Sequence, residues 1–338
     1  MSAPQDPKPI ARLTAFAETL ILLVAGSLAA AAIASALGLA GRDGRDALLF
    51  GAGGPRWIEA GGAETQWLLL RFGLTLALAW LICWWIGGPS RQLAGLSRGG
   101  RSLRDLIGFG VVMGVLLAAA PFGLRVLNEM FALGENTPFW NLMARHEWTP
   151  AFWLYMAASS FVIVPIVEEL FFRSYMLGRY RMHFTAGGAV LLSAALFWVS
   201  HGQYIKADPL LITNSVLVFI SAAILAWSAI RTGSVLPAII AHAIFNIPMT
   251  SPFRVAVVVL AVLLVVMLWA RIRAAASDFF RTLATTREWI FLAVLIGLLT
   301  ALAFIVRAYG QALIPLAGAI ALLALWGLIR RVPWARRG

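Results

Sequence analysis

Charged side chains are scarce in this sequence. Only 12% of the 338 residues are Asp, Glu, Lys or Arg, whereas 61% are hydrophobic. A soluble domain carries about a quarter charged residues, so this chain cannot cover a folded surface with polar groups. Its apolar surface requires lipid as the surrounding solvent. The composition therefore excludes an ordinary soluble globular protein and predicts an integral membrane protein.

Cysteine and acidic residues are also rare. Cys83 is the only cysteine, which excludes an intrachain disulfide and a metal cluster built on cysteines. The 27 basic residues outnumber the 15 acidic residues and give a net charge of +12. The arginines stand in short stretches between apolar runs, and no nucleic-acid-binding motif accompanies them. The positive charge therefore indicates membrane topology and contact with lipid headgroups, and no nucleic-acid partner is expected.

Apolar stretches of roughly the length that crosses a bilayer, about 20 residues, recur along the whole sequence. We expect ten membrane-spanning helices, at 14–40, 66–87, 105–126, 151–173, 186–202, 210–230, 234–248, 252–270, 289–306 and 311–329. The first stretch exceeds the apolar core of a signal peptide, so we expect it to be a retained span. The predicted fold class is all-α, a polytopic integral membrane protein with about ten transmembrane helices.

The connections between these spans differ in charge. If the N-terminus is cytoplasmic, most lysines and arginines fall on cytoplasmic segments, whereas Glu129, Glu135 and Glu147 fall on the other side. The positive-inside rule therefore favours a multi-pass protein with both termini in the cytoplasm. The preference for Arg over Lys, with abundant Ala, Gly and Leu, suggests a bacterial source, and hence the cytoplasmic (inner) membrane.

A few ionisable or amide side chains lie inside the apolar runs, where they are costly and often functional. Glu168 and Glu169 are adjacent in one span, His201 ends a second, and His242 with Asn246 lies in a third. Taken singly, each has an ordinary explanation, such as an ion pair at the water interface or an interhelical hydrogen bond. Their presence on three separate short spans favours a shared polar pocket.

The spacing of these residues supports that interpretation. Glu169 and Arg173 are four residues apart, which is the favourable spacing for a helical ion pair, and Glu168 points about 100° away. The polar stretch 179–188 predicts a turn between two antiparallel helices. Glu168 and His201 would then lie at the same height, each about 25 Å from the turn. His242 and Asn246 share one helix face because they are also four residues apart.

Three motifs in this region resemble those of a known family. The chain contains EExxxR, FxxxH and HxxxN in that order, formed by Glu168, Glu169 and Arg173, by Phe197 and His201, and by His242 and Asn246. Together they are similar to the CPBP family of intramembrane proteases, which includes CAAX prenyl endopeptidases of the Rce type and bacterial relatives linked to bacteriocin processing or self-immunity. The resemblance implies a CPBP-type helical core at 105–250. It would follow two transmembrane helices and a basic loop at 1–104 and precede a three-helix membrane extension at 251–338.

The resemblance also implies a glutamate protease mechanism and a role for each motif residue. Glu168 would be the general base for water, assisted by His201, while His242 and Asn246 would form the oxyanion hole. Glu169 and Arg173 would support the site. No metal and no other cofactor is expected.

Other functions stay open at this point. Two histidines and a glutamate could hold zinc, although the sequence lacks HExxH. The same fold could serve as a non-catalytic scaffold or immunity protein, and a polar pocket could relay protons in a transporter. For a protease, the expected partners are a peptide or membrane-protein substrate and the bilayer. A bacterial host is not expected to supply prenylated CaaX tails. The sequence does not indicate the oligomeric state.

Overall fold

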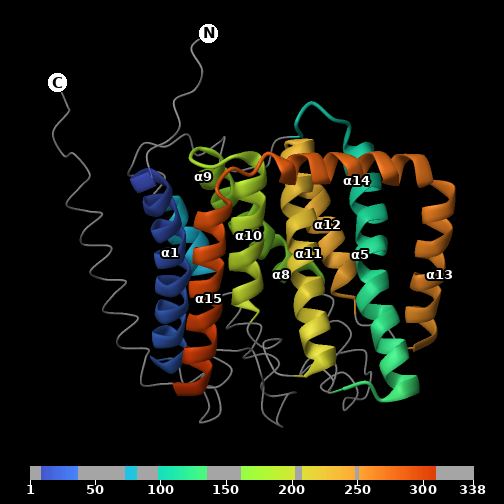
Figure 1. Cartoon of the computed structure of the whole chain (residues 1–338), viewed down its shortest axis with the longest axis horizontal. Helices are drawn as coiled ribbons and strands as arrows, with labels where there is room; N and C mark the ends of the chain where they lie inside the picture. The colour runs from blue at the N-terminus through green and yellow to red at the C-terminus, as the bar shows by residue number, and fades with distance from the viewer. Residues whose placement is uncertain are drawn as a thin grey trace.

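The computed structural model describes residues 9–36, 73–81, 98–134, 161–201, 208–247 and 251–309, and within these ranges it contains helices and no strand. Figure 1 shows most of these helices side by side as an upright bundle. The helices are α1 (Pro9–Ala36), α5 (Leu103–Phe131), α8 (Val164–Glu169), the π-helix η2 (Leu170–Met176), α9 (Leu177–Arg181), α10 (Ala186–Ser200), α11 (Pro209–Thr232), α12 (Leu236–Phe245), α13 (Ser251–Met267), α14 (Trp269–Ala284) and α15 (Trp289–Tyr309). The predicted all-helical class is therefore confirmed for the described residues.

Membrane-spanning length varies among these helices. Within the described residues, α5 and α11 are long and apolar enough to cross a membrane, and the bent pair α13 and α14 would make a third candidate. The helices α10 and α12 are apolar but shorter, with 15 and 10 residues. The expected tenth span at 311–329 lies outside the described residues. The ten-span count and the division at 104 and 250 stay predictions.

One end of the bundle collects basic side chains from segments far apart in the sequence. Arg12 at the start of α1 donates to the carbonyl of His183 at 3.0 Å. Arg101, just before α5, donates to the carbonyl of Arg231 at the end of α11 at 3.4 Å. The segments joined by these contacts were predicted to be cytoplasmic. We call the end of the bundle where they lie the basic end.

The helix α14 lies across the basic end and was not expected from the sequence. We predicted the segment 271–288 to be a connection, but most of it is helical, and it is bent by 90° from α13. Figure 1 shows α14 running across the tops of α5 and α11. Its arginines lower the average hydropathy of the segment and hide an apolar stripe at helical spacing. Such an amphipathic helix is typical of the membrane–water interface.

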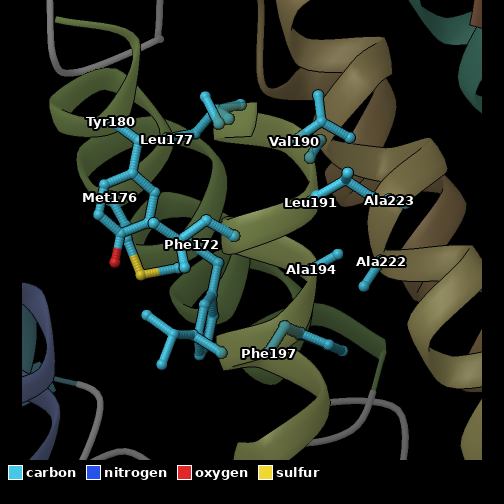
Figure 2. Close-up of a cluster of buried hydrophobic side chains, with 14 of the residues drawn as sticks. Phe172, Met176, Leu177, Tyr180, Val190, Leu191, Ala194, Phe197, Ala222 and Ala223 are labelled. Carbon is cyan, nitrogen blue, oxygen red and sulfur yellow. The ribbon is translucent and has the colours of Figure 1, made fainter. Parts of the chain in front are cut away.

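The main core is formed by the hairpin of η2 and α9 with α10, packed against α11. Figure 2 shows Phe172, Met176 and Tyr180 facing α10, and Ala194 of α10 facing Ala222 of α11. All of these side chains are buried. The small alanines let α10 and α11 approach closely, which is how helices pack in membranes. The turn spans residues 182–185, so the hairpin predicted for 179–188 is confirmed.

The hairpin turn is fastened by a cap and a carboxylate. The Thr185 hydroxyl accepts from the amide of Gly188 and so caps α10. The backbone amide and hydroxyl of Thr185 donate to Glu288, which precedes α15, at 3.0 and 2.8 Å. Burial opposes ionisation of Glu288, but the hydrogen bonds from Thr185 and the Arg287 amide outweigh it and lower the pKa of Glu288.

Two glycines on α5 bring α12 close to it. A Cβ on Gly110 would lie 3.0 Å from the carbonyl oxygen of Pro237, and one on Gly114 would lie 2.9 Å from the Cα of Ala241. Gly110 and Gly114 form a GxxxG spacing, which permits close approach of membrane helices. Because α12 carries His242, this contact fixes the height and rotation of a predicted site residue.

Candidate active site

The helix that carries the two glutamates is irregular around them. Pro165 lies in the first turn of α8 and follows three π-helical residues, 161–163. Proline lacks an amide hydrogen and releases a carbonyl one turn earlier. A second π-helix, η2, begins immediately after Glu169. Such π-helical segments occur frequently at functional sites, and here one separates the glutamates from the regular α9.

The predicted contact between Glu169 and Arg173 is present. Arg173 Nε lies 3.1 Å from Glu169 Oε2, and both side chains are fully buried. The guanidinium also donates to the Ala222 carbonyl of α11 at 3.4 Å and lies 4.1 Å from the centre of the Phe197 ring. An ion pair removed from water is favourable only when such additional contacts satisfy the charges. Arg173 therefore joins the glutamate helix to α10 and α11.

His242 lies between the two glutamates. Its Nδ1 is 2.7 Å from Glu169 Oε1, and its Nε2 is 3.8 Å from Glu168 Oε2. Glu168, Glu169 and His242 are 4%, 0% and 6% exposed. A carboxylate oxygen accepts hydrogen bonds, so Nδ1 donates to Glu169. The Oε2 of Glu168 has no hydrogen-bond donor among the described residues. This oxygen has the unmet accepting capacity that a water-binding base requires.

His201 is oriented by the last turn of α10. Its Nδ1 lies 2.8 Å from the carbonyl oxygen of Phe197. Because a carbonyl only accepts, Nδ1 donates, and the neutral ring carries its lone pair on Nε2. The Phe197 ring lies 4.3 Å from the His201 ring and 5.9 Å from the His242 ring, measured between centroids. The Phe197 ring therefore packs against both imidazoles.

A small cavity adjoins these groups. It has a volume of about 60 Å³, and its walls include Phe197 and His201 of the α10 segment, Ser221 of α11, and His242 and Asn246 of the α12 segment. A cavity of this size with several polar groups has room for water. Glu168 does not line this cavity. Its carboxylate lies 3.8 Å from Nε2 of His242, and His242 does line the cavity. Asn246 caps the C-terminus of α12, and its backbone N–H donates to the His242 carbonyl at 3.0 Å.

The structure thus brings the predicted residues into two connected groups. Glu168, Glu169, Arg173 and His242 form a buried charged cluster, and His201, His242 and Asn246 line the cavity, so that His242 belongs to both groups. The catalytic roles expected of these residues stay predictions. The contact between His242 and Glu169 did not follow from the sequence, because it joins residues 73 apart. The FxxxH spacing pairs Phe197 with His201, and the structure adds the contact of the Phe197 ring with His242.

The charges in the cluster have a chemical consequence. With both carboxylates ionised, Glu168 and Glu169 exceed Arg173 by one negative charge, which a protonated His242 would neutralise. In that form both nitrogens of His242 donate, one of them to Glu169. Within the described part of the chain, no group of three or more His, Cys, Asp or Glu side chains has the arrangement of a metal site. With His242 protonated, the arrangement would offer a carboxylate, a neutral imidazole and a cationic donor beside one cavity.

Comparison with known proteins agrees with the motif-based resemblance. Residues 150–248 match the family model described as type II CAAX prenyl endopeptidase Rce1-like. This segment contains all three motifs and the elements from α8 to α12. No curated protein matches the chain, and no solved structure matches it. The match over this segment therefore supports membership of the CPBP family, which the three motifs also indicate.

Proposed function

We propose that this protein is an intramembrane endopeptidase that hydrolyses a peptide bond with water activated by Glu168. The observation that carries the proposal is the placement of two buried carboxylates around His242, beside a cavity that His201 and Asn246 also line. A structural ion pair alone would not require the second carboxylate. Buried charge is costly in a membrane and is retained mostly where it has a use.

In the proposed reaction, water is held between Glu168 and the Nε2 of His201. Glu168 removes one proton from the water as its oxygen attacks the carbonyl carbon of the scissile peptide bond. The carbonyl π electrons move to oxygen, and the resulting oxyanion accepts hydrogen bonds from Nε2 of a protonated His242 and from the side-chain amide of Asn246. One such donor contributes about 3–4 kcal/mol to transition-state stabilisation. Collapse of the intermediate breaks the C–N bond, and Glu168 returns its proton to the leaving amine.

Glu169 and Arg173 serve as positioning residues in this proposal. The Glu169 carboxylate accepts from His242 Nδ1 and so fixes the direction in which Nε2 points. Arg173 in turn holds Glu169 by an ion pair at 3.1 Å. The Glu169 carboxylate thus contacts both His242 Nδ1 and the Arg173 guanidinium. Because these two groups already use the carboxylate, and because the guanidinium is positively charged, binding of a divalent cation to Glu169 is disfavoured. We therefore propose a metal-independent mechanism.

The proposed setting is the cytoplasmic membrane of a bacterium, crossed about ten times, with the basic end and both termini in the cytoplasm. Arg12, Arg101 and Arg231 at one end of the bundle support this orientation. The substrate class that we propose is a peptide or a membrane-protein segment. The name of the matching family refers to prenylated CAAX tails, but nothing in the site itself requires a prenyl group.

Peptide cleavage by the reconstituted protein tests the proposal. Vesicles containing the wild type are incubated with a peptide library, and new peptide termini are identified by mass spectrometry. We expect cleavage that persists with EDTA and is lost in Glu168→Ala, His201→Ala and Asn246→Ala. The control is Glu129→Gln, which removes a carboxylate near the C-terminal end of α5, outside the proposed site. If folded wild type produces no new termini, the protein is a non-catalytic scaffold; if EDTA abolishes cleavage, the metal-independent mechanism is wrong.

A further inference from the structure

A second and much larger cavity lies between α5, α11 and α14. Its volume is about 730 Å³, and its walls are almost entirely apolar. Phe109, Met113 and Leu116 of α5 form one side, Ile220 and Ile224 of α11 form another, and Phe279 of α14 contributes to the cover. Ligand sites in proteins commonly have volumes of about 300–1,000 Å³, so this cavity has the size of a specific binding site.

The polar groups of this cavity are gathered at the basic end. Arg104 at the start of α5 and Arg271 near the start of α14 are both exposed lining residues. Within the described residues, neither guanidinium has an ion-pair or hydrogen-bond partner. Asp105 also lies at the rim, but its carboxylate accepts from the Ser102 hydroxyl at 2.7 Å. The rim therefore carries two positive charges, on Arg104 and Arg271, and one negative charge, on Asp105, which is hydrogen-bonded to Ser102.

The cover of the cavity is fastened to the bundle. Asp278 of α14 forms an ion pair with Arg231 of α11 at 2.6 Å and accepts from the Trp227 indole at 3.2 Å. Trp227 also lines the cavity and packs against Phe279, with ring centroids 5.9 Å apart. The amphipathic α14 is therefore held across the end of the bundle, directly above an apolar space between α5 and α11.

We propose that this cavity binds one anionic phospholipid of the bilayer. The acyl chain lies against α5 and α11, and the phosphate lies between Arg104 and Arg271. A soluble phosphate would match the arginines but would leave the apolar walls unused. A zwitterionic lipid would place a third cation beside the two arginines. Basic pockets between membrane helices bind anionic headgroups in this way.

The binding of defined lipids to the purified protein tests the proposal. Delipidated protein is mixed with phosphatidylglycerol or phosphatidylcholine of the same chain length, and bound lipid is measured by native mass spectrometry. We expect wild type to prefer phosphatidylglycerol. The Arg104→Gln/Arg271→Gln double variant should bind it about 25-fold more weakly, because the loss of each arginine weakens binding by about a factor of five. The matched control is Arg98→Gln/Arg273→Gln, which removes two exposed arginines outside the cavity and should retain wild-type binding.

A steric variant tests the acyl-chain part independently. A Cβ on Gly108, which lines the cavity, meets no atom within 4 Å. Gly108→Leu should therefore fold, fill part of the cavity and weaken phosphatidylglycerol binding while both arginines remain. Equal binding of the two lipids by wild type, or equal binding by the two double variants, would overturn the proposal. So would stabilisation of the fold by inorganic phosphate alone, or unchanged lipid binding in Gly108→Leu.

Discussion

Glu168 and Glu169 are adjacent in the chain, yet their environments predict opposite effects of removing each charge. Glu169 contacts both Arg173 at 3.1 Å and His242 at 2.7 Å, and the Arg173 side chain is fully buried. In Glu169→Gln the guanidinium stays buried without its carboxylate. Breaking a buried ion pair by removing one partner costs about 3–5 kcal/mol of unfolding free energy. Because the Gln carbonyl still accepts from His242, we expect a value near the lower end, about 3 kcal/mol.

Glu168→Gln should behave differently. The Glu168 Oε2 has no hydrogen-bond donor among the described residues, and the imidazole Nε2 of His242 is 3.8 Å away. The variant removes a carboxylate beside another carboxylate and breaks no short contact, so the change in unfolding free energy should stay within about 1 kcal/mol. Peptide cleavage should nevertheless be lost. The pair of variants thus separates a stabilising carboxylate from a catalytic one.

The assay is reversible unfolding in mixed micelles, followed by circular dichroism, for both variants and wild type. The Glu169→Gln/Arg173→Met double variant serves as the control, because removing both charges should recover part of the lost stability. Equal destabilisation by Glu168→Gln and Glu169→Gln would refute the assignment of the structural ion pair to Glu169. Failure of the double variant to recover any stability would refute the proposed cause.

Three further predictions follow from other contacts. Gly114→Ala should destabilise the protein by about 1–3 kcal/mol, because the new Cβ would lie 2.9 Å from the backbone of α12. Gly108→Ala, whose Cβ meets no atom within 4 Å, should be neutral or stabilising. Equal shifts in melting temperature for the two variants would contradict this prediction. The lowered pKa of Glu288 means that its ionised form stabilises the fold above the unfolded-state pKa and that this contribution is lost as the pH falls through the folded-state pKa. Glu288→Gln should therefore lower the melting temperature at neutral pH, with a difference that shrinks below about pH 4.5; a difference independent of pH would contradict it. Phe197→Leu should reduce cleavage at least tenfold while the fold persists, because the ring that lies 4.3 Å from His201 is lost; wild-type turnover would show that the ring is only packing.

Much of the architecture around the site could be predicted from local spacing. The apolar stretches and the polar turn at 179–188 give the helical hairpin, and the four-residue spacing of Glu169 and Arg173 gives their ion pair. These features depend on interactions between residues close in sequence or on helix geometry alone. A close helix contact on α5 was also readable, because Gly110 and Gly114 have the GxxxG spacing, but only the structure identifies α12 as the helix that makes it.

Other features depend on tertiary packing and could not be predicted in this way. The bond between His242 and Glu169 requires the rotation of α12 about its axis, which α5 sets through its glycines. The helix α14 was missed because its arginines and apolar residues are interspersed along the sequence, so the average hydropathy resembles that of a loop. The π-helix after Glu169 has no recognisable pattern in the sequence.

The central claim is that Glu168 activates water for peptide hydrolysis, and the cleavage rate of Glu168→Gln tests it most directly. The variant and wild type are reconstituted in the same vesicles with EDTA, with unfolding free energies measured in parallel. We predict a loss of at least 100-fold in rate, in line with the roughly 10²–10⁴-fold contribution of a general base, and a nearly unchanged stability. A rate within a few-fold of wild type would contradict the claim.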